Sequence, residues 1–468
     1  MEEIDKEQKK IQDSTLVIAL ITNFITPFAG TALNIAVPHI GMEFGMSATS
    51  LTWIVLAFLL VSAVLSVPFG KLSDIHGRRP LLKLGVFLFG IASIVIIFSP
   101  NMELFILCRV IQGVGGAMIY STNVALLMDV FPAAKRGSVL GISVAAVYMG
   151  SALGPVIGGV ITYNLGWRAV FVAISALSFV AFIIAMVWSP KEKEKMPDAG
   201  GNKIKFSSVF MFILSFGLFL FGVATLMQNI WSYFILAAGI VLVILYVKYE
   251  SKRESPLFEI RLFKGNRVFT LSLLAALFNY AAIYAIAYLM SLYLQLGRGF
   301  AADISGLILI FQPVVQAALS PVAGRLSDKK PPSNIASLGM ACCAAALAMF
   351  VFLDESTPMA YIIGGLLLTG FGIAFFSSPN SNVILSSVSN KDYGIASSLN
   401  STARTFGQVI GMALLTIIIH ITIGNVPIAN VGADALIRDM RVSYIVFSAI
   451  CVVGVLISLQ RRKTKTAE

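Results

Sequence analysis

The chain carries, at Ser50–Pro80, the stretch SLTWIVLAFLLVSAVLSVPFGKLSDIHGRRP. Its first 21 residues contain no charged side chain, and a helix of about 20 apolar residues is long enough to cross the hydrocarbon core of a bilayer. A short loop with Lys71, Asp74, Arg78 and Arg79 follows directly. An apolar block that ends in a basic loop is typical of a membrane helix that ends at the cytoplasm.

The same alternation of apolar blocks and short charged loops continues along all 468 residues. Apolar side chains make up 57% of the chain and charged ones 12%, about half of the roughly 25% found in soluble domains, which excludes a water-soluble globule. We expect only helices, because in lipid each backbone group must find its partner within its own segment. At about 33 residues per span and loop, the sequence predicts fourteen membrane helices and no separate soluble domain.

The expected spans cover residues 14–37, 50–70, 81–99, 103–128, 138–162, 167–188, 207–227, 230–248, 267–294, 304–324, 334–353, 357–378, 393–423 and 441–460. The first span is preceded by a charged stretch and is too long for a secretory signal peptide. We therefore expect it to remain in the mature protein.

Basic residues predict the orientation of these spans, because short cytoplasmic loops are enriched in Lys and Arg. With the N-terminus in the cytoplasm, 28 of the 34 basic residues fall in inner segments. Outer loops keep Arg168, Arg298, Arg438 and Arg441, while Arg109 and Arg404 lie inside spans. Both termini are expected to be cytoplasmic. The net charge of +11 is then explained by topology, and no nucleic-acid partner is expected.

Metal, cofactor and nucleotide chemistry is not indicated. The four cysteines, Cys108, Cys342, Cys343 and Cys451, lie within spans without metal-ligand spacing, and the three histidines form no helical pair. No phosphate-binding Gly-x-x-x-x-Gly-Lys-Ser/Thr loop occurs. We expect neither an enzyme nor a cofactor, and any uphill transport must draw on an ion gradient or a partner.

An internal repeat appears in two loops. GKLSD at 70–74 is matched by GRLSD at 324–328, displaced by 254 residues, and Gly154 and Gly158 have near counterparts in Gly407 and Gly411. Parallel repeats of this kind are found in transporters. The repeat predicts a cytoplasmic N-terminus (1–13), a six-helix bundle (14–188), a cytoplasmic loop (189–206), two inserted helices (207–248), a second loop (249–266), a second six-helix bundle (267–460) and a cytoplasmic tail (461–468).

Three ordered motifs carry a family resemblance. GKLSDIHGRRP (70–80) resembles the cytoplasmic signature of the major facilitator superfamily, RVIQGVGGA (109–117) its fourth-helix signature, and GSALGPVIGG (150–159) the fifth-helix signature of its exporters. With fourteen spans, the chain is similar to the drug:proton antiporter branch that includes multidrug and tetracycline exporters. The resemblance implies an all-α membrane protein of two six-helix bundles with two inserted helices.

The first motif is expected to act as a gate. Arg78 or Arg79 can pair with Asp129 at the cytoplasmic end of the fourth span, and Asp74 can face a helix N-terminus of the second half, where the helix dipole favours an anion. In related proteins such a cluster resembles a latch that holds the outward-facing state. The alternative is that these residues only set topology. The candidate gating residues are Gly70, Asp74, Gly77, Arg78, Arg79, Asp129 and Asp328.

Polar residues on single helix faces indicate an aqueous cavity between the halves. Arg109 lies within a span, where a charge is costly and usually functional, and Arg404 repeats this in the second half. Either arginine can instead be a structural tie between helices. The candidate cavity residues for substrate binding or proton coupling are Asn34, Arg109, Gln112, Tyr120, Asn123, Tyr280, Tyr284, Tyr288, Gln312, Gln316, Asn400, Arg404 and Gln408.

A stripe of small residues in the fifth span predicts close helix packing. Gly150, Gly154 and Gly158 are spaced by four, so they share one helix face on which a neighbour can approach closely. Pro155 removes one backbone hydrogen bond and allows a bend, and Gly159 completes the candidate packing set. The stripe is either an interface about which the halves rock or ordinary helix packing.

Acidic residues are missing where related antiporters usually have one. None of the 23 Asp and Glu residues falls in the middle of an expected span. Related antiporters usually carry an acid before the positions of Thr31, Asn34 and Pro38, where this chain has only Phe28–Gly30. A buried carboxylate commonly neutralises a cationic substrate or carries a proton, so the two intramembrane arginines favour neutral or anionic substrates.

The sequence predicts a secondary transporter in the cell membrane that exports a small organic compound by alternating access, in exchange for protons. We expect a monomer whose partners are the small-molecule substrate, protons and the lipid bilayer. An uncoupled carrier or a lipid-precursor flippase on the same fold is the main alternative. A non-transporting membrane sensor is less favoured, because the longest loop is too short for a signalling segment.

Overall fold

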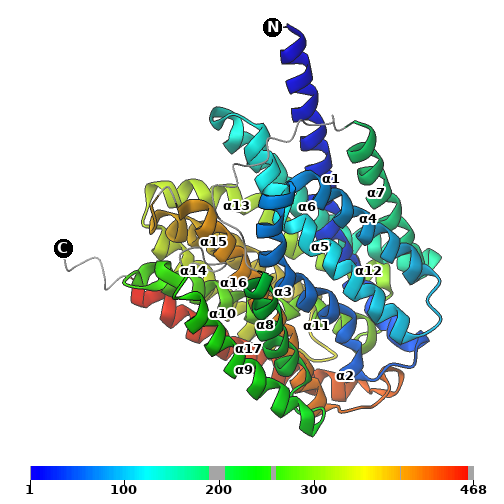
Figure 1. The fold of residues 1–468 in the computed structure, drawn as a ribbon. Coiled ribbons are helices and arrows are strands. Elements are labelled where there is room, and N and C mark those ends of the chain that lie inside the picture. Colours follow the sequence, from blue (N-terminus) through cyan, green and yellow to red (C-terminus); the bar gives the residue numbers. More distant parts are fainter. Residues whose placement is uncertain (1, 189–205, 254–259, 390–391, 462–468) are drawn as a thin grey trace.

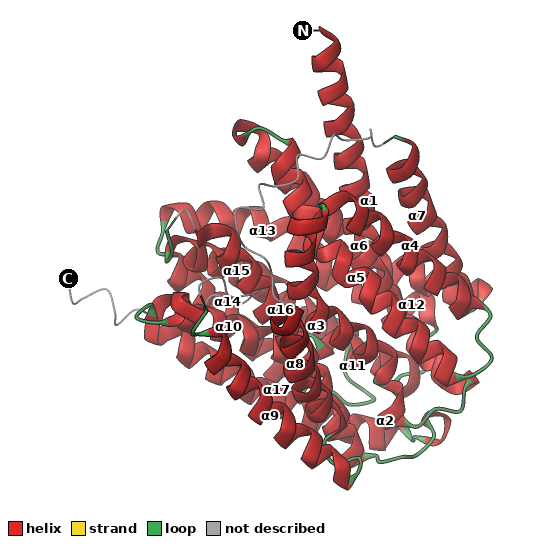
Figure 2. Cartoon of the chain, viewed as in Figure 1, coloured by secondary structure: helices red, strands yellow, loops and turns green. Residues whose placement is uncertain are grey.

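The protein is described by a computed structural model that covers residues 2–188, 206–253, 260–389 and 392–461. These residues form helices and loops without a β-strand (Figure 2). Fourteen helical segments are long and apolar enough to cross a membrane. The elements are α1 (Glu2–Glu43), α2 (Ala48–Leu51), α3 (Trp53–His76), α4 (Arg78–Ile97), α5 (Met102–Val130), α6 (Ala133–Leu165), α7 (Trp167–Val187), α8 (Phe206–Thr225), α9 (Ile230–Glu250), η1 (Ile260–Phe263), α10 (Arg267–Ile283), α11 (Ala285–Leu292), η2 (Tyr293–Gly297), α12 (Ala302–Leu309), α13 (Phe311–Lys329), α14 (Pro332–Phe350), α15 (Met359–Ser386), α16 (Tyr393–Thr422), η4 (Ile428–Asn430) and α17 (Ala433–Gln460).

The helices form two six-span bundles with the same internal packing. In the first, α1 packs on α6, α3 and α4 pack on α5, and α4 packs on α7. In the second, α10 packs on α16, α13 and α14 pack on α15, and α14 packs on α17. The blue-to-cyan bundle and the yellow-to-red bundle lie side by side in Figure 1. The 254-residue repeat in the sequence thus corresponds to a repeat in helix packing.

The remaining two spans, α8 and α9, pack mainly on each other. Helix α8 also contacts one helix from each bundle, α3 and α16. Phe216 of α8 lies against Phe406 of α16, with ring centroids 5.4 Å apart, and Phe221 lies 5.8 Å from Trp53 of α3. Helix α9 is largely exposed, as Phe234 at 64% exposure illustrates. The pair therefore lies on the outside of the two bundles, over one seam between them.

Glycines bring the first and fifth spans of each bundle into backbone contact. A Cβ atom on Gly158 of α6 would lie only 2.7 Å from the Cα of Ala32 in α1, and one on Gly150 would meet the carbonyl of Phe24. The equivalent glycines of α16, Gly407 and Gly411, lie as closely against the α10 backbone. Side-chain-free stripes allow this close approach, which supplies dispersion contacts and the Cα–H to carbonyl contacts common at helix interfaces.

The two bundles are joined at one end of the molecule. Ser291 of α11 donates to the carbonyl of Asn34 at 2.6 Å, and Thr416 of α16 donates to Thr52 at 2.8 Å. The segment after α16 completes the junction. Its Val426 carbonyl accepts from Ala48 N, and its Ile428 N donates to the Met46 carbonyl. We call these contacts the outer junction, because the distribution of basic residues predicts that they lie on the external side.

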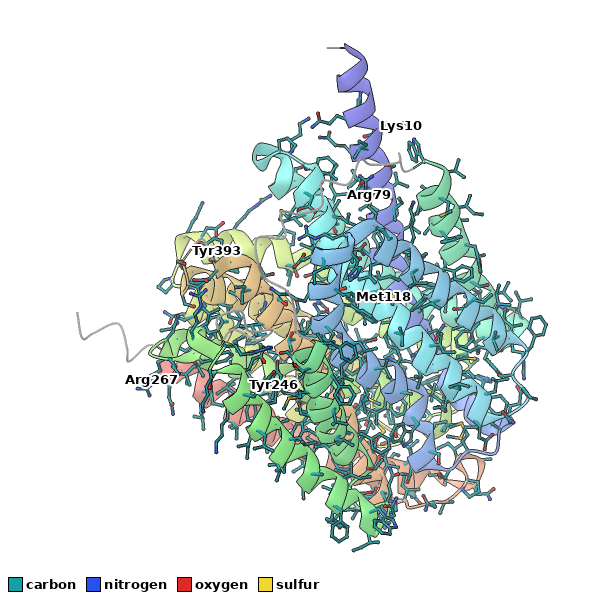
Figure 3. All side chains as sticks on the ribbon, viewed as in Figure 1. Lys10, Arg79, Met118, Tyr246, Arg267 and Tyr393 are labelled. Atoms are coloured by element: carbon teal, nitrogen blue, oxygen red, sulfur yellow. The ribbon has the colours of Figure 1, made fainter. Side chains whose placement is uncertain are left out.

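The opposite side carries both chain ends (Figure 1). Figure 3 places Lys10, Arg79, Arg267 and Tyr393 along that same side, from the top of the view to its left edge. The described parts of the two bundles are held together at the outer junction and where α6 packs on α12 and α13.

One expected boundary was wrong. The sequence analysis left residues 424–440 in an outer loop, but α17 begins at Ala433 and adds two turns to the last span. Leu436, Ile437 and Met440 are buried at helical spacing, and Asp439 shares their face with no exposed surface. This carboxylate therefore lies inside a helix, contrary to the expectation for the last span. The ninth span is also not one regular helix, since it runs through α10, α11 and the π-helical η2.

The orientation can be tested by cysteine labelling of the full chain after the four native cysteines are replaced. Asp434→Cys, which is exposed beside the outer junction, should react in intact cells with a membrane-impermeant maleimide. His76→Cys, which is exposed at the end of α3, should react only after the cells are permeabilised. Equal labelling of the two sites in intact cells would contradict the assigned topology.

Candidate functional site

The side chains that converge between the bundles centre on Arg404 of α16. Its guanidinium carbon lies 5.2 Å from the ring centroid of Tyr280 in α10, a cation–π contact. Tyr120 of α5, Tyr148 of α6 and Tyr284 also interact electrostatically with Arg404. Both Arg404 and Tyr120 keep more than a third of their surface exposed. We call these five residues the Arg404 site. It draws two helices from each bundle and the residue that links α10 to α11, so it changes whenever the bundles move relative to each other.

Hydrogen bonds hold parts of this site in place. The Tyr280 hydroxyl lies 3.0 Å from Ser377 Oγ of α15, and Asn400 of α16 donates to Ser381 Oγ at 3.0 Å. Tyr280 is buried, and its ring lies beneath the Arg404 guanidinium. Among the described residues, Arg404 forms no ion pair, so its charge is balanced only by phenol groups and by whatever occupies the space beside it.

Arg109 has a different environment. It is 3% exposed, donates from Nε to the Ile54 carbonyl of α3 at 2.9 Å and from Nη1 to Gln112 Oε1 at 2.6 Å. Gln112 in turn donates to Ser93 of α4 at 2.7 Å, and the guanidinium carbon lies 4.8 Å from the Phe58 ring centroid. Arg109 thus ties three helices of the first bundle together, while Tyr120 and Tyr284 connect it electrostatically to the Arg404 site.

The other candidate cavity residues differ in burial and in their partners. Asn123 is buried and donates to Thr22 and Asn23 of α1, each at 2.9 Å. Asn34 is buried beneath the outer junction, and Tyr288 is buried beside α17. Gln312, Gln316 and Gln408 are half-buried. A role in substrate binding or proton coupling stays a prediction for each of them.

Tyr148 was not among the residues that the sequence analysis selected. It lies in the middle of a span, two residues before the glycine stripe of α6. A tyrosine at that depth, away from both membrane interfaces, was an available signal, since its hydroxyl needs a polar partner there. The packing of α6 on α1 turns Tyr148 toward Arg404.

The first cytoplasmic loop forms a three-residue ion cluster. Arg78 at the start of α4 donates to Asp74 of α3 at 2.8 Å and to Asp129 of α5 at 2.5 Å. Gly77 between the helices has a φ of 91°, which favours glycine, whereas Gly70 meets no close neighbour. Arg79 reaches Thr15 of α1 at 3.5 Å. In this conformation Asp74 thus has its partner within its own bundle.

The corresponding loop of the second bundle is held more weakly. Asp328 accepts a hydrogen bond from Asn382 at 3.5 Å, and Asn382 also reaches Ser327. No glycine and arginine follow Asp328, since the sequence continues with Lys329 and Lys330. The two repeats therefore share the position of the acid but not its arginine partner.

Comparison with known proteins agrees with this architecture. A family model described as Major Facilitator Superfamily matches residues 19–412 and, in a second match, residues 272–467. The riboflavin transporter RibZ of Clostridioides difficile (strain 630) is 28% identical over 448 residues, which cover 95% of this chain and 96% of the relative. The multidrug efflux pump LfrA of Mycolicibacterium smegmatis is 28% identical and covers 86% of this chain and 79% of its own.

The fold also has a solved counterpart. The crystal structure of a D-xylose-proton symporter superposes with a TM-score of 0.68 at 14% sequence identity and covers 96% of this chain and 97% of its own. At that identity the likeness concerns the fold alone. The chain belongs to the Major Facilitator Superfamily, and it is a multi-pass transporter of the cell membrane rather than an enzyme.

Proposed function

We propose that the protein exports a neutral or anionic aromatic compound by alternating access, in exchange for protons. The observation that carries the proposal is the Arg404 site, in which an exposed guanidinium that has no acidic partner among the described residues lies among four tyrosines. A relative named as a riboflavin transporter supports an aromatic substrate, and a relative named as a multidrug efflux pump supports export.

The charge of the site favours some substrates over others. A positive charge away from bulk water repels a cationic ligand more strongly than it does in solution. Phenol rings offer apolar faces with hydrogen-bonding tips, which suits a planar compound that carries carbonyl or hydroxyl groups. An arginine adds two parallel donors for a carbonyl pair or a carboxylate. Riboflavin, a planar uncharged heterocycle with a polyhydroxyl chain, is therefore the first probe to test.

Alternating access fits the way the bundles are joined. The outer junction contains few hydrogen bonds, several of them to backbone carbonyls that water can also satisfy when the junction opens. The glycine contacts lie mainly within each bundle, so each bundle can move as a unit. When the opposite end closes, Asp74 comes free to face a helix N-terminus of the second bundle. One chain contains both halves of this cycle, so we propose a monomer as the working unit.

Transport into proteoliposomes tests the proposal directly. Inverted vesicles with an acidic lumen should accumulate riboflavin, and collapse of the pH gradient should abolish the accumulation. An uncoupled carrier would equilibrate riboflavin regardless of the pH gradient. Tight binding and robust transport of ethidium, with no binding of riboflavin or of an anionic dye, would overturn the assignment of substrate charge.

Arg404→Gln should weaken binding of an anionic dye about tenfold or more, since loss of one charge-assisted contact amounts to about 1.4 kcal/mol or more. Binding of uncharged riboflavin should change by less than about threefold, and Arg404→Lys should be intermediate for the anion because an ammonium lacks the planar donor pair. Fluorescence titration of the purified protein measures the affinities for the anionic dye and for riboflavin. Arg438→Gln, which removes an exposed arginine from α17, is the matched control.

Asp74→Asn should slow transport by about tenfold while expression and riboflavin binding stay within about twofold, because the residue is needed to stabilise one conformation and not to fold a bundle. Asp328→Asn should have a milder effect, since its loop lacks the arginine partner. Initial transport rates in proteoliposomes, normalised to protein content, compare the two variants. Rates close to wild type for Asp74→Asn would reduce the first loop to a determinant of topology.

A further inference from the structure

A buried acid lies beside the outer junction. Asp439 of α17 has no exposed surface, and one of its oxygens accepts a hydrogen bond from Thr422 at the end of α16. Its second oxygen, Oδ2, is buried without a partner in the described chain. Thr422 is followed directly by the segment whose Gly424 and Val426 carbonyls bind α2 and its flanking residues. Asp439 is thus connected to the outer junction through its hydrogen bond with Thr422, because Gly424, two positions later in the chain, already takes part in the junction.

The elements packed on α17 bring no positive charge to Asp439. Helix α11 presents Tyr288, whose buried hydroxyl has no hydrogen-bond partner among the described residues and interacts electrostatically with Asp439. The end of α16 presents His420, whose Nδ1 is also unpartnered, and η2 presents Tyr293. The other buried or half-buried titratable groups on α10, α14, α17 and the α10–α11 link include neutral side chains, namely Tyr280, Tyr284, Cys342, Cys343, Tyr444 and Cys451. The buried Arg461 lies at the far end of α17 from Asp439 and donates to Ser272 and Asn380 there.

The nearby charged residues are directed elsewhere. Arg298 donates to the Thr357 carbonyl at 2.7 Å and to the Tyr293 hydroxyl at 3.3 Å. Arg438 and Arg441 of α17 are exposed, as is Asp434 in its first turn. Asp354 is tied to its own loop through Ser356 and Thr357. Within the described residues, Thr422 is therefore the donor that faces the Asp439 carboxyl group.

A carboxylate in such surroundings is far less stable than a carboxylic acid. Removing an ion from water without a paired charge costs several kcal/mol, and the usual outcome is that the group binds a proton instead. A protonated Oδ2 carries no charge, so protonation removes the cost of burying an unpaired ion at this position. The ionised form needs water, and water reaches this position only if the outer junction separates.

We propose that Asp439 is a proton-binding site of the transport cycle, which takes up a proton from the external side and must hold it for the outer junction to close. The proposal rests on the proposed function insofar as it assumes alternating access. After substrate is released outside, protonation of Asp439 allows Thr422 and the following segment to dock on α2. The closed conformation binds one proton more than the open one, so it is favoured at low pH and loses population as pH rises.

The experiment measures the junction itself, without substrate. Spin labels on Leu165→Cys and Phe352→Cys, exposed at the outer ends of the first and second bundles, report the separation by double electron–electron resonance in a background without native cysteines. In nanodiscs, the wild-type ratio of open to closed protein should rise with pH, by up to about tenfold per pH unit within the titrating range. In the Asp439→Asn variant the outer junction should stay closed at every pH. In the Asp439→Glu variant the ratio of open to closed protein should still depend on pH.

Two further variants keep the test decisive. Asp434→Asn, which neutralises an exposed acid one and a half turns earlier on the same helix, should behave like wild type. Thr422→Val removes the donor that favours the ionised form, so its transition should move to higher pH. If Asp439→Asn fails to fold, this shift alone still tests the site. Wild-type distances that do not change with pH, or an unchanged transition in Asp439→Asn or Thr422→Val, would overturn the proposal.

The outcome is separable from that of the proposed function. Riboflavin transport with a pH-independent junction would reject Asp439 as a proton site and leave the transporter proposal intact. A pH-dependent junction in a protein that neither binds nor transports riboflavin or anionic dyes would support the proton site and reject the proposed substrate.

Discussion

The bilayer obliges each spanning segment to satisfy its own backbone hydrogen bonds, and the architecture follows from that constraint. Helices that are complete in themselves cannot exchange strands or unfold locally in lipid, so large changes of shape must come from whole bundles moving against each other. Glycine stripes stiffen each bundle by bringing α6 onto α1 and α16 onto α10. The weaker contacts are left to the outer junction, where hydroxyl groups and backbone carbonyls can exchange their partners for water.

Three isolated ionisable groups inside the membrane are accommodated by three different physical means. Arg109 is surrounded by a backbone carbonyl, an amide oxygen and an aromatic ring, so its charge is solvated by the first bundle. Arg404 remains partly exposed in the space between the bundles. Asp439 has no exposed surface, and among the described residues its carboxyl group accepts a hydrogen bond from Thr422. These different surroundings are the basis on which we propose substrate binding at Arg404 and proton exchange at Asp439.

The sequence was sufficient for the spans and the repeat, because the pattern of apolar blocks and basic loops depends on composition that each segment carries locally. The sequence was not sufficient where contacts between distant segments determine the structure. Residues 433–440 have three charges and resemble a loop, yet Leu436, Ile437 and Met440 find a packing surface and extend α17. Spacing alone also could not separate Arg109 from Arg404, since both lie on polar stripes. Arg109 and its hydrogen-bond partner Gln112 are held by α3 and α4, whereas Arg404 lies among tyrosines from both bundles.

The hairpin of α8 and α9 has a consequence for lipids. Its contacts with α3 and α16 cover one of the two seams along which the bundles meet, whereas α6 with α12 and α13 forms the other. Acyl chains and membrane-dissolved amphiphiles are thereby kept from the first seam by a layer of aromatic packing, Phe216 on Phe406 and Phe221 on Trp53. The transporter is therefore asymmetric toward the bilayer, despite its internal repeat. The second seam is closed in a different way, since Gly159 of α6 lies against the Ala302 backbone and Gly306 of α12 against the Pro155 backbone.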